Sequence, residues 1–293
     1  NASSTNGAVG GNLSITATGH ITQNVAVNIG GTTTLDVGNS KDITLTNASN
    51  RFTGAIIITA ARNIDLGATG DIVLGTSDVS GTYEITSTGN ISDAVGATLT
   101  VAGTSVFITT TDGSNIILDS SGNAFADAVT MKAETDGSEA FGNITFVDSG
   151  AVNFNSSGST DGDLFIDGST DGAVGGNLSI TATTGDITQG IALAVTGTSS
   201  FTTSRINDDI TLGSVNVFTG GVTLNTSGST GHAVVDNGTT ALIIAASSVG
   251  GDLTLTSGAA AGITDSGNVT VTGNLIATTD ANSGVINMGT LRV

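Results

Sequence analysis

Short segments of alternating apolar and polar residues recur along the whole chain. In Leu13-Ser-Ile15, Ile43-Thr-Leu45 and Val222-Thr-Leu224 the apolar residues stand two positions apart, which is the period of a β-strand. Such segments are rich in β-branched residues and are separated by Gly, Asn, Asp and Ser. No segment sustains a helical period. The pattern predicts an all-β protein of many short strands, with no substantial helix.

The strand-like elements return in a fixed order. The segment Gly7–Thr18 recurs unchanged at Gly172–Thr183. Weaker copies of its core give four repeat starts, at Gly11, Gly81, Gly176 and Gly251. Each start is followed by a Val/Ile-x-Gly-Thr/Asn element, then by an Ile-x-Leu/Met element and, in three copies, by an element that begins with Phe. The chain therefore consists of super-repeats at approximately 11–80, 81–175, 176–250 and, in part, 251–293.

A super-repeat of this length divides into three turns of roughly 23 residues, and the strands are too many and too short for one sandwich. We interpret residues 1–293 as a single continuous parallel β-helix, or β-solenoid, right-handed and with 12 or 13 turns stacked about 4.8 Å apart. The chain has no proline, as expected where most strand positions donate an N–H to a neighbour. Its many glycines are expected at corners that need positive φ.

The second super-repeat is about 20 residues longer than the others. The surplus lies within residues 126–175 and includes strand-like runs at Ile144-Thr-Phe146, Val152-Asn-Phe154 and Leu164-Phe-Ile166. Because the surplus is close to one turn, we expect one extra turn of the solenoid here, and no protruding domain.

The repeat elements resemble those of a known group of bacterial exoproteins. The order Gly-Gly-Asn-Leu-Ser-Ile-Thr-Ala-Thr, Val-Thr-Gly-Thr, Asp-Ile-Thr-Leu and Phe-Thr-Gly is similar to the repeats of filamentous-haemagglutinin-like adhesins, which are exported by two-partner secretion, and of related surface proteins. The resemblance covers nearly the whole chain. It implies a secreted bacterial protein at the cell surface that supports adhesion or biofilm scaffolding. The secretion domain of the family is not recognisable, so the resemblance implies a piece of the shaft.

The charge of the chain excludes two classes of partner. Six basic residues stand against 25 acidic ones, which gives a net charge of −19. The basic residues are scattered singly, whereas binding to a phosphate backbone or an anionic membrane needs clustered cations. No apolar run approaches the roughly 18 residues of a membrane span. We therefore expect no nucleic-acid partner and no membrane insertion.

The densest acidic group is a candidate metal site. It comprises Asp161, Asp163, Asp167 and Asp171, whose hard oxygen ligands suit Ca²⁺. The spacing matches neither an EF-hand nor a Gly-Gly-x-Gly-x-Asp repeat, and the alternative interpretation is solvated turns between strands. No other cofactor is expected.

β-Helix folds also carry enzymes that cleave glycans, which need clustered carboxylates and aromatic platforms. This chain has no Trp, one Tyr and no Cys. Its two histidines are His20 and His232, and His20 takes the place of Asp186 in the near-identical copy, as a variable surface corner does. We therefore assign no catalytic residue and expect no enzyme.

The sequence thus favours a structural extracellular shaft or filament, and the alternative is a glycan-binding or glycan-degrading β-helix. Both ends of the sequence lie in mid-repeat: residues 4–7 match 169–172, and residues 286–293 match 210–217. A solenoid end without a cap exposes unpaired backbone groups. We therefore expect either a piece cut from a longer adhesin, with flanking parts as partners, or a subunit that stacks end to end with further copies. The sequence assigns no receptor; the candidate receptors are a host molecule and a glycan.

Overall fold

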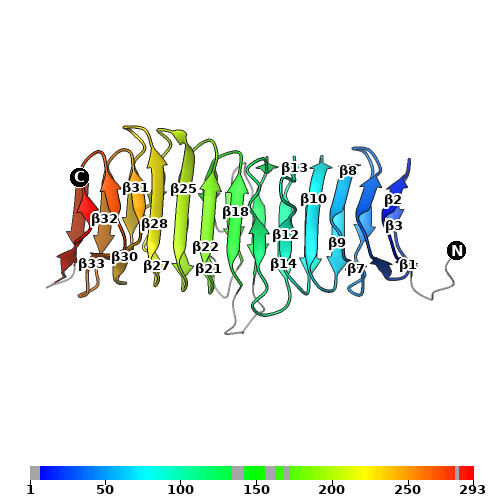
Figure 1. Ribbon diagram of the computed structural model, residues 1–293, viewed down its shortest axis with the longest axis horizontal. Coiled ribbons are helices and arrows are strands. Elements are labelled where there is room, and N and C mark those ends of the chain that lie inside the picture. The colour runs from blue at the N-terminus through cyan, green and yellow to red at the C-terminus, as the bar shows by residue number, and fades with distance from the viewer. Residues whose placement is uncertain (1–6, 134–141, 156–162, 168–171, 281–283) are drawn as a thin grey trace. The chain divides into compact units, whose positions relative to one another are not determined.

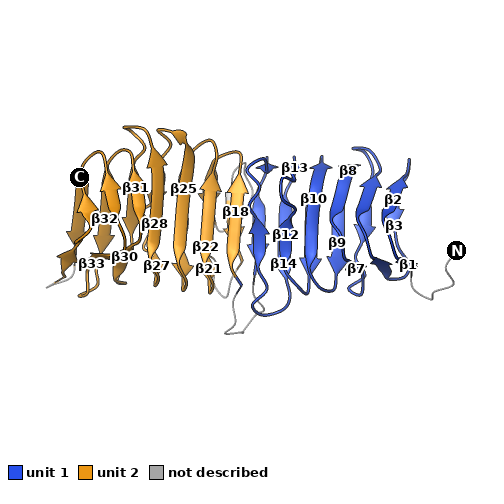
Figure 2. Cartoon of the chain, viewed as in Figure 1, with its two compact units in different colours: residues 1–142, 158–162 blue, residues 143–157, 163–293 orange. Residues whose placement is uncertain are grey.

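The structure is a computed structural model, and its interpretable part is all-β. It describes residues 7–133, 142–155, 163–167, 172–280 and 284–293. The chain divides into two compact units, with residues 1–142 and 158–162 in unit 1 and residues 143–157 and 163–293 in unit 2 (Figure 2). Every regular element in the described ranges is a β-strand, and neighbouring strands are parallel. None of those ranges holds a helix with the length and apolar character of a membrane span. The predicted fold class, a parallel β-solenoid, is confirmed.

Unit 1 contains three sheets, whose strands follow one another in the order of the turns (Figure 1). Sheet I consists of β3 (Ile21–Thr22), β6 (Ile43–Leu45), β9 (Ile64–Ala68), β11 (Tyr83–Ser87), β14 (Ser105–Thr109) and β17 (Val129–Lys132). Sheet II consists of β2 (Leu13–Thr16), β5 (Thr33–Asp36), β8 (Ile56–Ala61), β10 (Ile72–Val79), β12 (Ile91–Asp93), β13 (Leu99–Val101), β15 (Ile116–Leu118) and β16 (Ala124–Phe125). Sheet III consists of β1 (Gly7–Val9), β4 (Val27–Ile29) and β7 (Arg51–Phe52).

Unit 2 has the same three kinds of sheet. Its sheet I consists of β20 (Asp163–Ile166), β19 (Val152–Phe154), β23 (Ile187–Gln189), β26 (Ile210–Leu212), β29 (Ala233–Asp236), β32 (Leu253–Ser257) and β35 (Leu275–Thr279). Its sheet II consists of β18 (Ile144–Asp148), β22 (Leu178–Ala182), β25 (Ser199–Ile206), β28 (Val222–Ser227), β30 (Leu242–Ile244), β31 (Ser247–Val249), β33 (Ile263–Asp265), β34 (Val269–Val271), β36 (Ile286–Asn287) and β37 (Leu291–Arg292). Its sheet III consists of β21 (Ala173–Val174), β24 (Ala194–Val195) and β27 (Val217–Phe218).

The turns stack in register, as the repeat predicts. Registered partners are 19 residues apart at Ile64 and Tyr83 and 24 apart at Ser105 and Val129, close to the predicted 23. Inward residues stack on their equivalents in the next turn and are buried, and outward residues alternate with them. Counted in sheet I, with β20 set aside, each unit has six turns, so the chain has about 12.

The Phe of each third repeat element belongs to the core. Phe52, Phe125 and Phe218 are no more than 4 % exposed. Two of them meet other buried rings edge to face: the ring centroids of Phe107 and Phe125 are 6.0 Å apart, and those of Phe201 and Phe218 are 5.8 Å apart. This geometry favours aromatic pairs beyond the area that they bury. Phe52 and Phe218 lie in sheet III and Phe125 in sheet II, so the Phe elements stabilise the core from two of the sheets.

The glycine of the Val/Ile-x-Gly-Thr/Asn element has a different role from the one expected. Positive φ occurs at nine described glycines, but not at the four glycines of this element. At Gly197, an added Cβ would stand 2.5 Å from the carbonyl oxygen of Gly176 in the preceding turn, to which Gly197 donates its N–H at 3.0 Å. The same crowding occurs at Gly31, Gly103 and Gly273. Glycine at this position therefore leaves room for the backbone of the preceding turn. The expectation of positive φ was wrong for these four glycines.

The surplus segment contributes a strand to sheet I, but out of sequence order. β19 pairs with β23 on one side, as the solenoid path requires, and with β20 on the other, with Phe154 opposite Leu164. Leu164 and Ile166 are each 1 % exposed, so β20 contributes to the core. Residues 134–141, 156–162 and 168–171 lie outside the described residues, and a complete extra turn stays a prediction.

Candidate functional site

Three shallow hollows lie along a single turn of unit 1, the turn that contains β9. The acidic hollow has a volume of about 240 Å³ and is lined chiefly by Asp42, Asn63, Asp65 and Glu84. The threonine hollow, of about 320 Å³, is lined by Asp65, Gly67 and their neighbours, which include Thr46, Thr86, Thr88 and Thr110. The arginine hollow, of about 270 Å³, is lined by Arg51, Phe52, Thr53, Thr69, Gly70, Asp71 and Val73.

Two outward positions of β9 create the first two hollows. Asp65 is registered between Thr44 and Glu84 of the adjacent strands, so two carboxylates stand side by side on one face. Gly67 is registered with Thr86 and presents no side chain to solvent. The floor of the threonine hollow is therefore the backbone of β9, and the surrounding threonines form its walls.

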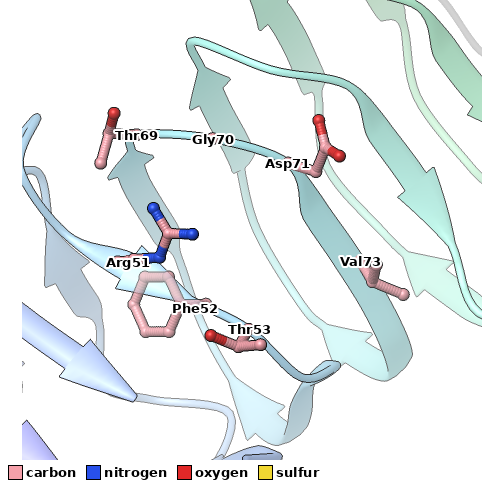
Figure 3. A pocket seen from close by; sticks show the side chains of 7 residues that line it. All are labelled: Arg51, Phe52, Thr53, Thr69, Gly70, Asp71 and Val73. Carbon is pink, nitrogen blue, oxygen red and sulfur yellow. The ribbon is translucent and has the colours of Figure 1, made fainter. Parts of the chain in front are cut away.

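The arginine hollow lies at the corner between β9 and β10. Figure 3 shows the guanidinium of Arg51 beside the turn formed by Thr69, Gly70 and Asp71. Gly70 has a φ of +81° and donates its N–H to the hydroxyl of Thr88 at 2.8 Å. The hydrogen bond to Thr88 fixes this chain reversal against the following turn of the solenoid.

Arg51 and Asp71 line the same hollow but are engaged differently. The carboxylate of Asp71 accepts hydrogen bonds from the backbone N–H and the side-chain amide of Asn90, at 2.8 and 3.1 Å. Arg51 is exposed, and its guanidinium forms neither a hydrogen bond nor an ion pair with any residue that the structure describes. A free guanidinium in a strongly acidic chain is suited to bind an anionic group.

A ladder of side-chain acceptors runs along the corner that precedes sheet I. In unit 1, the N–H of Asp42 donates to Nδ1 of His20 at 3.0 Å, and in unit 2 the N–H of Asp209 donates to Asp186 at 2.8 Å. His232 repeats the arrangement by accepting the N–H of Asp252 at 2.8 Å. His and Asp exchange at this corner because each supplies one acceptor to the next turn. The predicted equivalence of His20 and Asp186 is confirmed by these contacts.

The acidic hollow contains an ion pair. Arg62 donates from Nε and Nη2 to the two carboxylate oxygens of Asp42, at 2.8 and 2.7 Å. This hydrogen bonding lowers the pKa of Asp42 below its usual value; desolvation opposes the shift, and the charges of Arg62 and His20 add to it. Arg62 is engaged with Asp42, and within the described part of the chain neither Asp65 nor Glu84 forms an ion pair.

We expect the substitution Arg62→Gln to raise the pKa of Asp42 towards its usual range. A carboxylate whose pKa is lowered by folding stabilises the folded state above its unfolded pKa of about 4, and this contribution is lost as pH falls through the folded pKa. An NMR titration of the Asp42 carboxyl carbon measures the shift. The control His20→Asn keeps a corner acceptor and should leave most of the shift in place, whereas an unchanged pKa in Arg62→Gln contradicts the assignment.

A buried Asn precedes each Phe element by two residues. Asn50, Asn123 and Asn216 are fully buried, and each side chain bonds to backbone groups or to a polar side chain one turn earlier. Gln23 bonds to Asn50 and Gln189 to Asn216. Asp93 takes their place beside Asn123. Burial, followed by the charge of Asp93, raises the pKa of Asp119 above its usual value. These are structural polar contacts, and the sequence interpretation did not identify them.

The predicted Ca²⁺ ligands fall largely outside the described residues. Asp161 and Asp171 lie in undescribed segments, and Asp163 begins β20 with its side chain outside the description. Asp167 follows β20 and is half-buried. Among the side chains that are described, no group of three or more His, Asp or Glu residues is arranged to hold a metal ion. The Ca²⁺ site stays a prediction.

The aromatic residues give no platform for stacking sugar rings within the described ranges. Their rings are buried except for that of Phe165, which is half-buried. Burial raises the pKa of Tyr83 to about 12, so its hydroxyl is not a base at neutral pH. The outward surface therefore offers hydroxyl, amide and carboxylate groups.

The fold defines a repeat protein of the β-solenoid class. The chain belongs to the family described as "Repeats of unknown function (DUF5649)", whose pattern matches it four times, at residues 1–59, 61–132, 141–225 and 230–290. No curated protein and no solved structure shows significant similarity to the chain. The four matches agree with a chain of four repeats, and the predicted super-repeat boundaries stay a prediction.

Proposed function

We propose that the chain is a structural segment of an extracellular bacterial surface protein, a shaft or filament that supports adhesion or biofilm formation. The observation that carries the proposal is the layered construction of each unit. Within each unit, described turns contact each other through parallel backbone pairing and stacked apolar side chains, and corner acceptors such as His20 and His232 join them further. Such a structure extends by adding turns, because each turn contacts only its neighbours.

The outward chemistry supports a structural role over an enzymatic one. The hollows of unit 1 are shallow, and their carboxylates serve as corner acceptors or stand beside threonines. General acid–base catalysis requires two groups positioned around one bond with separated pKa values. We therefore propose that the chain has no catalytic activity and no obligatory cofactor, and that its location is the cell surface.

Antibodies against the purified chain test this location. On intact cells that produce the protein, we expect the antibodies to label the surface before permeabilisation, with a cytosolic protein as the negative control. Deletion of the chain should reduce adhesion or biofilm mass, and re-expression should restore it. Labelling that appears only after permeabilisation would contradict the proposed location at the cell surface.

The proposed partners are further copies of the chain, stacked end to end, or the flanking parts of a longer adhesin. Sedimentation velocity over a wide range of concentrations separates the two. Stacking predicts that the mass of the sedimenting species increases with concentration. A head-to-tail contact that forms no closed ring continues to add subunits. A constant 28.5 kDa monomer contradicts stacking and leaves flanking segments as the partner.

A further inference from the structure

We propose that unit 1 binds an oligosaccharide that carries a single carboxylate, with the carboxylate on Arg51 and neutral sugars over the threonine hollow. This activity goes beyond the structural role proposed above. The geometry that points to it is the alignment of the hollows along one turn. The acidic and threonine hollows share Asp65. The threonine and arginine hollows adjoin where the hydroxyls of Thr88 and Thr69 approach to 3.3 Å.

Arg51 provides the anion-binding end. Its guanidinium is exposed and unpaired among the described residues, and it lies beside the hydroxyl-bearing residues Thr53 and Thr69 (Figure 3). A guanidinium offers paired N–H donors that match the two oxygens of a carboxylate. Asp71 accepts hydrogen bonds from Asn90 at the same corner and, among the described contacts, forms no ion pair with Arg51.

The threonine hollow fits neutral sugars better than it fits a peptide. An extended peptide gains affinity by pairing its backbone with a free sheet edge, but the backbone of β9 is already paired on both sides, with β6 and β11. The groups that remain are hydroxyls and the carboxylate of Asp65. Thr46 and Thr86 are exposed and can exchange hydrogen bonds with sugar hydroxyls, while their methyl groups contact the C–H faces of the ring.

The acidic hollow limits the number of negative charges on the ligand. Asp65 and Glu84 stand on adjacent strands in register, and Arg62 is paired with Asp42, another residue that lines this hollow. A second carboxylate placed over this hollow meets uncompensated like charge. The surface therefore selects an oligosaccharide with one terminal carboxylate and rejects a polyanion.

Titration calorimetry of the full chain with three probes tests the proposal. The probes are sialyllactose, which has one carboxylate, lactose, which has none, and polygalacturonate, which has many. We expect the order sialyllactose, then lactose, then polygalacturonate, with sialyllactose bound on the order of tenfold more tightly than lactose. Equal binding of the first two probes, strongest binding of polygalacturonate, or binding of none overturns the proposal. So does equal competition by a peptide rich in glutamate.

Three substitutions locate the site. Arg51→Gln should weaken sialyllactose binding on the order of tenfold and leave lactose binding unchanged. Gly67→Thr fills the threonine hollow and should weaken both, and Thr86→Val, which removes one exposed hydroxyl, should weaken both to a smaller extent. The matched control is Gly213→Thr in unit 2, where an added Cβ meets no atom within 4 Å. Circular dichroism verifies folding, and binding unchanged in both Arg51→Gln and Thr86→Val contradicts the assigned surface.

Discussion

Replacing Asn216 by Ala is expected to lower the free energy of unfolding by about 3 kcal/mol, because it leaves buried backbone groups without partners. Asn216 is fully buried. Its Oδ1 accepts from the N–H of Leu193 at 2.8 Å, and its Nδ2 donates to the carbonyl of Leu212 at 3.0 Å. The N–H of Leu193, a residue that is 1 % exposed, is then cut off from both protein and water. Urea unfolding followed by circular dichroism measures the loss.

Two further variants isolate the cause of that loss. Ser214→Ala lies two residues away and keeps the backbone N–H that donates to Gln189, so we expect a change within about 0.5 kcal/mol. Asn216→Asp keeps an acceptor for Leu193 but turns an ionised oxygen towards the carbonyl of Leu212, so it should be destabilising at neutral pH and partly recover in acid. A loss for Ser214→Ala as large as that for Asn216→Ala would mean that the buried amide is not the cause.

The local pattern sufficed for the fold because each turn repeats the same alternation. Segments such as Ile43-Thr-Leu45 place two apolar residues on one face, and stacking identical turns then buries a continuous core. The sequence also contains an Asn-x-Phe motif at Asn50, Asn123 and Asn216. Its meaning was missed because Asn is usually exposed, and only the three-dimensional path places a backbone N–H within its reach.

The position of β20 could not be predicted from local pattern. Leu164-Phe-Ile166 has the alternation of a strand, but alternation does not say which edge of β19 the strand joins. The candidate surface on β9 was also missed, since Asp65 and Gly67 interrupt the repeat rather than follow it. The sequence does mark these two positions, because Ile64-Asp-Leu-Gly67 differs at both from the Ile-Thr-Leu-Thr segment of the preceding turn. In a repeat protein, such departures are the positions to inspect for binding.

Replacing Gly197 by Ala is expected to be the second most damaging change, with a loss of about 2–3 kcal/mol from overpacking. The new Cβ would stand 2.5 Å from the carbonyl oxygen of Gly176 and 2.7 Å from its carbon, so one backbone must move away from the other. The side chain of Asn177 closes the remaining space, since its Oδ1 accepts the N–H of Thr198 at 2.8 Å. Urea unfolding again measures the loss, and hydrogen exchange at Thr198 reports whether this corner opens.

The matched control for Gly197→Ala is Gly213→Ala. Gly213 has no positive φ and open space around its Cβ position, so the same substitution restricts only the unfolded chain and should stabilise by about 0.5 kcal/mol. If spacing between turns is the reason for the glycine, the two variants must change stability in opposite directions. Equal losses at both positions would instead indicate that backbone conformation, and not the contact between stacked turns, fixes glycine in the Val/Ile-x-Gly-Thr/Asn element.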